Sequence, residues 1–107
     1  MIYEYRVYHA EPGRMNDLHD RFATKTDALF AKHNIKSIGY WVPEGKEEED
    51  LIYILAFDSK DQMKQAWADF AKDPDWEATV AETEANGPLV AGVESTIFFA
   101  TSYSALQ

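Results

Sequence analysis

The chain has 107 residues and a formal net charge of −9, from 19 acidic and 10 basic residues, so we expect one domain, residues 1–107, with a single core. Because the basic residues do not cluster, we expect neither nucleic acid nor a membrane as a partner. The absence of cysteine excludes disulfides, thiolate nucleophiles and cysteine-based metal sites. No apolar run approaches the roughly 20 residues of a membrane helix, so we expect a soluble cytoplasmic protein.

The first predicted strand covers residues 2–9 and ends before a Pro-Gly turn. Side chains alternate between the two faces of a strand. One face therefore carries Glu4, Arg6 and Tyr8, an acid, a base and a phenol in a row. The other face is mostly aromatic and aliphatic, and suits packing on a helix layer.

Residues 14–33 form the first predicted helix. Apolar side chains recur there at helical spacing, at Met15, Leu18, Phe22, Leu29 and Phe30. His19 and His33 fall on or beside this stripe, and Asn34 suits a left-handed stop after it.

Two strands follow, at residues 35–42 and 51–57, joined by an acidic, turn-rich loop. Ser59 then caps a second helix, and Gln62 completes a capping box. Pro74 opens a third, shorter helix at a position where its missing N–H does no harm. The fourth strand covers residues 93–100.

This order, β-α-β-β-α-β, predicts an α+β fold of the ferredoxin-like type, with a four-stranded antiparallel sheet and the helices on one face. The third and fourth strands are apolar on both faces, although helices can cover only one. An uncovered apolar face of this kind marks an interface. A second copy of the sheet, packed face to face at roughly 10 Å, would cover it, so we expect a two-fold homodimer.

The opening stretch Ile2-Tyr3-Glu4-Tyr5-Arg6-Val7-Tyr8, followed by Pro12-Gly13, resembles the opening motif of the NIPSNAP family. A second signature is Trp67-x-x-Phe70-x-x-Asp73-Pro74-x-Trp76, followed by Glu82-x-x-x-Asn86-Gly87-Pro88-Leu89-Val90. The resemblance spans residues 2–103. It implies a dimeric α/β barrel, in which two ferredoxin-like sheets face each other. Related barrel proteins include cofactor-free monooxygenases, isomerases and haem-degrading enzymes.

Arg6 is the first candidate ligand-binding residue, with Tyr8 beside it on the strand. Neighbours on one strand face lie roughly 6.5–7 Å apart, so Arg6 can pair with Glu4 or bind a carboxylate or enolate. The alternative is a structural ion pair that holds two subunits together, because buried charges are tolerated when they are paired.

The other candidates are His19, Trp41 and Trp67. His19 could line a pocket between helix and sheet and act as a base near neutral pH, or it could be a hydrogen-bonded core residue. Tryptophans at helical spacing are usually core residues. Fourteen helical residues separate His19 from His33 by roughly 21 Å, so the two cannot share a metal ion. We expect no metal, no haem and no other cofactor.

Two functions fit these observations. The first is a cofactor-free enzyme, monooxygenase- or isomerase-like, or a small-molecule-binding protein, with a small aromatic or anionic ligand held between sheet and helices. The second is a non-catalytic dimeric interaction module, in which the acidic loop at residues 44–50 recognises another protein. A cavity of at least roughly 300 Å³ lined by the candidate residues would favour the first.

Overall fold

A computed structural model describes all residues, 1–107. The strands are β1 (Ile2–Ala10), β2 (Lys36–Trp41), β3 (Asp50–Phe57) and β4 (Val90–Phe99). The helices are α1 (Met15–Arg21), the π-helical turn η1 (Phe22–Thr26), α2 (Asp27–Lys32), α3 (Lys60–Lys72) and α4 (Pro74–Thr83). The elements thus follow the predicted order, and α4 is the short third helix. None of the helices is both long and apolar enough to span a membrane.

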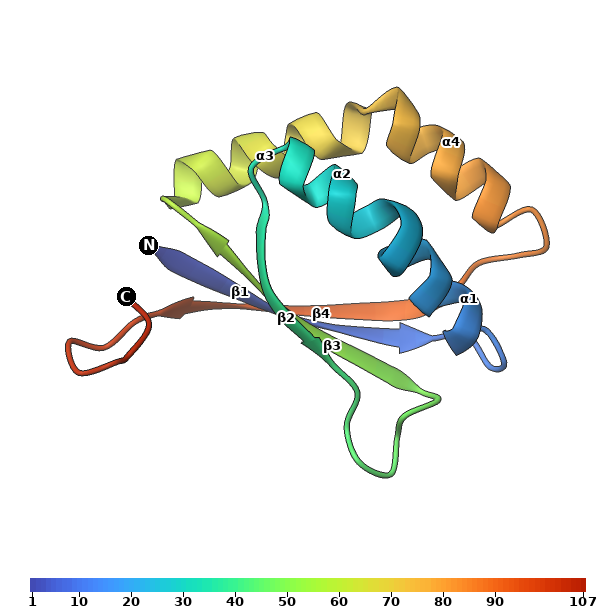
Figure 1. Ribbon diagram of the computed structural model, residues 1–107, viewed down its shortest axis with the longest axis horizontal. Coiled ribbons are helices and arrows are strands. Elements are labelled where there is room, and N and C mark those ends of the chain that lie inside the picture. Colours follow the sequence, from blue (N-terminus) through green and yellow to red (C-terminus); the bar gives the residue numbers. More distant parts are fainter.

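The four strands form one antiparallel sheet in the order β2-β3-β1-β4. All helices lie on one side of this sheet (Figure 1). The register places Glu4 of β1 between Leu55 of β3 and Ile97 of β4. This arrangement is the ferredoxin-like α+β fold, which confirms the predicted fold class.

Side-chain caps fix the boundaries of α3 and α4. The Ser59 hydroxyl accepts a hydrogen bond from the Gln62 N–H, and the Gln62 side chain accepts one from the Asp58 N–H. The Asp73 carboxylate accepts from the Asp75 N–H at 2.8 Å and caps α4, with Pro74 as the first helical residue. These local signals are readable from the sequence, which is why the predicted helix starts are correct.

The first helix is continuous from α1 through η1 to α2 but changes its hydrogen-bond pattern at its centre. In η1 the backbone forms a π-helical turn, and the Thr26 hydroxyl also donates to the Arg21 carbonyl at 3.3 Å. The helix ends at Asn34, which adopts the left-handed conformation with φ of 60°. Apolar spacing predicted the helix and its stop, but not the π turn, which is a feature often found at functional sites.

The core lies between the helices and the sheet. The helix-facing side chains of β3 form its floor and are at most 3% exposed, namely Leu51, Tyr53, Leu55 and Phe57. Aromatic rings fill the space above them, with Phe22, Phe30 and Phe70 contacting one another in sequence. These rings pack with the aliphatic side chains of the first helix, such as Leu18 and Leu29, in one hydrophobic core.

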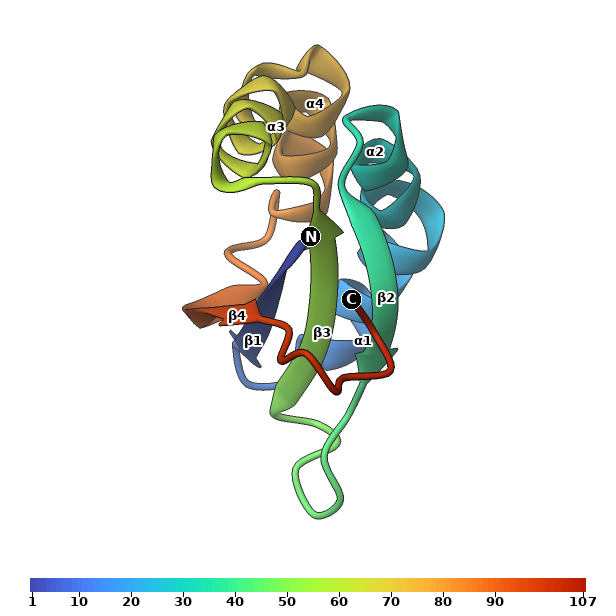
Figure 2. The same ribbon diagram turned by 90° about the vertical axis from the view of Figure 1, so that its left-hand side faces the viewer.

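The opposite side of the sheet has no helix, and we call it the open face. It carries apolar side chains from all four strands, including Tyr5, Val7, Ile52, Ile54 and Phe98. The chain after β4 turns back across one end of this face (Figure 2). A cavity of 310 Å³ separates this tail from the sheet. The open face is therefore apolar along β3, as predicted, whereas β4 contributes Glu94 and Thr96 beside Phe98. The chain itself covers this face only in part.

Candidate functional site

The acid, base and phenol of β1 lie on the helix-facing side of the sheet. Glu4 is 4% exposed, and its Oε1 accepts a hydrogen bond from the Trp67 Nε1–H of α3 at 2.8 Å. Glu4 and Arg6 do form the ion pair of the structural alternative, but they lie away from the side of the sheet that has no helix. The pair instead joins the sheet to α3 within one chain, because the ring of Trp67 can reach down from the helix to the middle of β1.

Arg6 is the centre of a group of contacts that we call the Arg6 cluster. Its Nη1–H donates to Glu4 Oε2 at 2.8 Å, and its Nε–H donates to the Tyr53 hydroxyl at 2.8 Å. Its Cζ lies 4.7 Å from the centre of the Trp67 ring, a stacked geometry that favours a guanidinium. The members of the cluster are Glu4, Arg6, Tyr8, Tyr53, Trp67 and Ser95.

The electrostatics of the cluster keep its arginine charged. Burial lowers the pKa of Arg6, but contacts with Tyr53, Tyr8 and Glu4 outweigh burial and raise its pKa above the ordinary value. Burial likewise raises the pKa of Tyr53 well above its ordinary value, so this phenol stays protonated. The cluster therefore holds a fixed, charged guanidinium that is paired with the Glu4 carboxylate and contacts the protonated phenol of Tyr53.

One side of the guanidinium remains free. The hydrogen bonds of Arg6 use Nε and Nη1, and Nη2 makes none, although the Tyr8 hydroxyl is close enough to help raise the pKa of Arg6. Of the Arg6 side chain, 16% is exposed. By contrast, Glu4 is fully engaged, because Oε2 also accepts from the Ser95 hydroxyl at 2.6 Å. The free N–H groups of Arg6 can therefore take a further acceptor without breaking the Glu4 pair.

The cluster borders a stretch of sheet that the helices leave uncovered, which we call the β4 shelf. It comprises the helix-facing side chains of β4, namely Val93, Ser95, Ile97 and Phe99. Val93 is 49% and Phe99 67% exposed, although both point to the helix side. Figure 2 shows β4 at the sheet edge below α3 and α4. An apolar surface thus lies directly beside the fixed cation.

The five predicted site residues do not form one pocket. Arg6, Tyr8 and Trp67 come together in the cluster, but Arg6 lines none of the main cavities. Trp41 is 50% exposed and lies on the open face, opposite Ile52 of β3. Its place in the site was predicted from residue type alone, and the alternation along β2 points it away from the helices.

His19 lies apart from the Arg6 cluster, in a cavity of 360 Å³ between the first helix and the edge of the sheet. Its side chain is exposed and makes no hydrogen bond within the chain. The alternative that His19 is a hydrogen-bonded core residue is therefore wrong. The helix turns this residue to the rim of the apolar stripe rather than into its centre.

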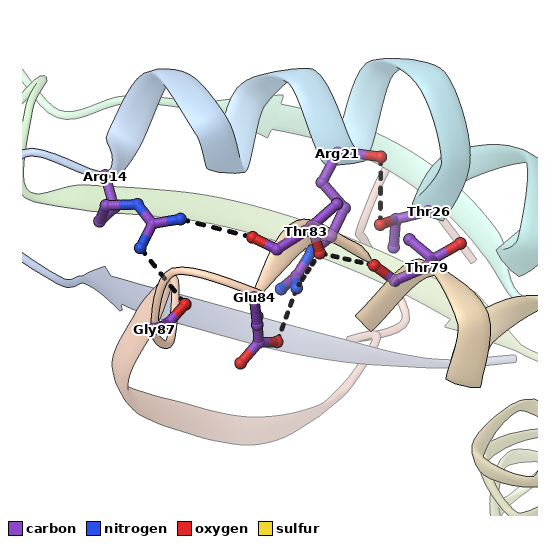
Figure 3. Close-up of polar contacts among 7 residues, drawn as sticks. All are labelled: Arg14, Arg21, Thr26, Thr79, Thr83, Glu84 and Gly87. Carbon is purple, nitrogen blue, oxygen red and sulfur yellow. Dashed lines mark hydrogen bonds and ion pairs between the residues drawn. The ribbon is translucent and has the colours of Figure 1, made fainter. Parts of the chain in front are cut away.

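Sequence reasoning missed a second buried arginine (Figure 3). Arg21 is 5% exposed, and its Nη1 donates to Glu84 at 2.8 Å and to the Thr83 hydroxyl at 3.2 Å. Arg14 donates to the Thr83, Asn86 and Gly87 carbonyls at 3.3–3.4 Å. Cations at the carboxyl end of α4 stabilise its dipole. The seven-residue spacing of the two arginines on one helix face was the available signal.

The other two histidines bind carboxylates. His33 Nε2 lies 2.6 Å from Asp73, and hydrogen bonds from Lys32 and then His33 hold the pKa of Asp73 well below its usual range. His9 lies on the open face, with Nδ1 2.7 Å from Asp50 and Nε2 2.6 Å from Glu94. These carboxylates, Asp50 first, raise the pKa of His9. Both histidines therefore serve as ion-pair partners.

The four-stranded antiparallel sheet and its single helix layer define an α+β protein of the ferredoxin-like class, the class that includes antibiotic-monooxygenase-like folds. The NIPSNAP family model matches residues 3–105. The chain belongs to the NIPSNAP family, as its opening strand and its Trp-Asp-Pro-Trp signature predicted.

Solved structures show the same fold. A NIPSNAP family protein from Agrobacterium tumefaciens is 24% identical, with 99% of this chain and 98% of that chain covered and a TM-score of 0.86. An uncharacterized NIPSNAP domain protein from Burkholderia xenovorans is 15% identical, with coverages of 97% and 98% and a TM-score of 0.82. SnoaB from Streptomyces nogalater, a cofactor-independent oxygenase, is 15% identical, with coverages of 99% and 97% and a TM-score of 0.65. No curated protein matches this chain.

Proposed function

We propose that the Arg6 cluster binds the anionic group of a small aromatic compound. The observation that carries this proposal is the free side of the Arg6 guanidinium, which is charged, held in place by Glu4 and Tyr53, and still open to solvent. A carboxylate or phenolate that meets Nη2 gains a charge-assisted hydrogen bond with little loss of side-chain freedom, because the arginine is already ordered.

The surroundings of Arg6 favour an aromatic ligand over an aliphatic one. Trp67 and Tyr8 place ring faces and edges around the guanidinium, and the β4 shelf adds the exposed Val93 beside them. A planar ring can lie on this apolar surface while its charged group reaches Arg6. The ligand class is therefore a small aromatic acid or an aromatic enol that ionises.

The same geometry suits chemistry without a cofactor. A fixed cation lowers the energy of a substrate enolate or phenolate, the form that reacts in cofactor-free catalysis. The fold that this chain shares with the cofactor-independent oxygenase SnoaB supports this role as an analogy of fold. We propose a cofactor-free enzyme of the monooxygenase or isomerase type, or a binding protein for a small aromatic acid or enol. The cytoplasmic location that composition predicts stays a prediction.

Thermal unfolding with 3-(4-hydroxyphenyl)propionate tests the site. At a hundredfold excess over Kd, ligand binding adds about 2.7 kcal/mol of stability, which raises Tm by roughly 10 °C in a domain of this size. We expect the double variant Glu4→Gln/Arg6→Met to fold and to lose this rise. Lys64→Met, which removes an exposed cation of α3, is the matched control and should keep it. A double variant with an undiminished rise refutes the site.

We also propose that a second copy of the chain covers the open face. This proposal is supported by the apolar side chains that remain exposed on the open face, including Trp41 at 50% and Phe98 at 43% exposure. Exposed apolar surface of this kind marks a protein interface. Light scattering should give about 24 kDa, twice the 12.2 kDa chain mass. A well-folded monomer at micromolar concentration contradicts this proposal. The acidic loop, residues 44–50, stays an alternative recognition element.

A further inference from the structure

The cavity beside His19 has the features of a second ligand site. It measures 360 Å³, within the usual range of small-molecule sites. One wall is a row of helix positions four residues apart, His19, Ala23 and Asp27, which share one face of the helix. Tyr40 of β2 and Leu51 of β3 form the other wall, over a floor of Phe22. The small side chain of Ala23 leaves the middle of the row open.

The two ends of this cavity differ in chemistry. At one end, Asp27 Oδ1 accepts hydrogen bonds from the Tyr40 hydroxyl at 2.7 Å and from the Ser37 hydroxyl at 2.9 Å. Its Oδ2 accepts none, and no cation of the chain pairs with this carboxylate. At the other end, the His19 imidazole is exposed and has no hydrogen-bond partner. Both ends therefore have unused hydrogen-bonding capacity.

The hydroxyl of Tyr40 helps to keep Asp27 in place. Burial, followed by the hydrogen bond to Asp27, raises the pKa of Tyr40 above its ordinary value, so this phenol remains a donor. Its ring also contacts Phe22 at 5.4 Å between centroids. The carboxylate is thus a fixed negative charge at the end of an aromatic groove.

We propose that this cavity binds a small aromatic amine. The ammonium group meets the free oxygen of Asp27, the ring packs over Ala23 against Phe22 and Tyr40, and a polar substituent at the far end reaches His19. Aromatic faces near an ammonium add cation–π attraction. The net charge of −9 also raises the local concentration of cations and disfavours anions at a carboxylate.

This site is separate from the Arg6 cluster. The two share no residue, but they adjoin: Phe22, which lines the cavity, contacts Tyr8 and Tyr53 of the cluster with ring centroids 5.6 and 5.3 Å apart. The groups with unused hydrogen-bonding capacity also have opposite charge, because Glu4 of the cluster is fully engaged and leaves Arg6, whereas the cavity offers Asp27. The two sites should therefore select ligands of opposite charge, and either proposal can fail without the other.

Tyramine and 3-(4-hydroxyphenyl)propionate form a matched pair of probes, because they share a phenol ring and differ in the charge of the side chain. In ¹H–¹⁵N correlation spectra of the intact chain, we expect tyramine to shift the amides of residues 19–27 and of Tyr40. The propionate should leave these amides unchanged. Saturable shifts there with tyramine support the site. The absence of saturation up to 10 mM, taken as about the weakest binding worth assigning to a site, overturns it.

Three variants locate the ligand. Ala23→Leu fills the middle of the cavity and should weaken tyramine binding by at least about tenfold. Asp27→Asn keeps an oxygen for Tyr40 and Ser37 but removes the charge, and should weaken it by about five- to tenfold. Ala71→Leu, on the exposed side of α3, is the control and should change nothing. Unchanged affinity in both Ala23→Leu and Asp27→Asn, each folded by its spectrum, refutes the proposal.

Discussion

Removing Arg6 without its partner should destabilise the fold far more than removing the pair. In Arg6→Met, the Glu4 carboxylate stays 4% exposed and keeps the Trp67 and Ser95 donors, but it loses its only cation. Leaving a buried charge without its ion partner costs about 3–5 kcal/mol. Because 16% of the Arg6 side chain already reaches solvent, we expect the lower end, about 3 kcal/mol.

The double variant Glu4→Gln/Arg6→Met leaves no charge behind. The glutamine oxygen can still accept from Trp67, and its amide can donate to the Ser95 hydroxyl. We therefore expect its stability to lie within about 1 kcal/mol of the parent chain. The coupling between the two positions would then exceed about 2 kcal/mol, the size expected for residues in one buried network.

Urea unfolding, followed by tryptophan fluorescence, measures the free energy of unfolding of the parent chain, Arg6→Met, Glu4→Gln and the double variant, which together form a double-mutant cycle. A domain stability of about 5–15 kcal/mol leaves the single variant folded at the start of the titration. If Arg6→Met alone is as mild as the double variant, the Glu4 carboxylate is not dependent on this cation. The account of the cluster as a paired buried charge would then be wrong.

Three further predictions concern other parts of the molecule. Phe98→Asp, on the open face, should convert a dimer to a monomer in light scattering, and a persistent dimer places the interface elsewhere. Asp50 and Glu94 raise the pKa of His9 in the folded state. The stability that His9 adds should therefore be complete below about pH 6.5 and be lost as pH rises through the pKa of His9 in the folded protein. His9→Gln should remove this pH dependence from unfolding curves, and a variant with the same pH profile as the parent chain contradicts the prediction. Arg21→Met should cost only about 1–2 kcal/mol, less than Arg6→Met, because the side chain of Glu84 is 29% exposed and can rehydrate; a larger loss than that of Arg6→Met reverses this order.

The sequence by itself determined the order of the elements, because their signals are local. Ser59 and Gln62 cap α3, Asp73 and Pro74 start α4, and Asn34 ends the first helix in the left-handed region. The order of the elements also predicted that one face of the sheet would lack a helix, and the apolar side chains on both faces of β3 predicted that this face would be apolar. The family followed from two short motifs, in the first strand and around Asp73-Pro74, which can be read from residue type and spacing alone.

The assignment of each face to a partner depended on the tertiary structure. Alternation along β1 grouped Glu4, Arg6 and Tyr8, but a period of two cannot say which group meets the helices. Only the packing of α3 showed that Trp67 reaches Glu4. The group with both charges consequently lies on the helix side, and the prediction that the aromatic residues of the other face pack on the helices is wrong.

The grouping of the site residues was also decided by long-range contacts. Trp41 at the end of a predicted strand and Trp67 on a predicted helix were both candidate site residues, yet they lie on opposite sides of the sheet. His19 and Asp27 border one cavity because Ala23, midway between them, is small and because β2 passes beside the helix. Sequence spacing fixes the first of these conditions, whereas the position of β2 beside the helix is set by its pairing with β3 and by the packing of the helices on the sheet.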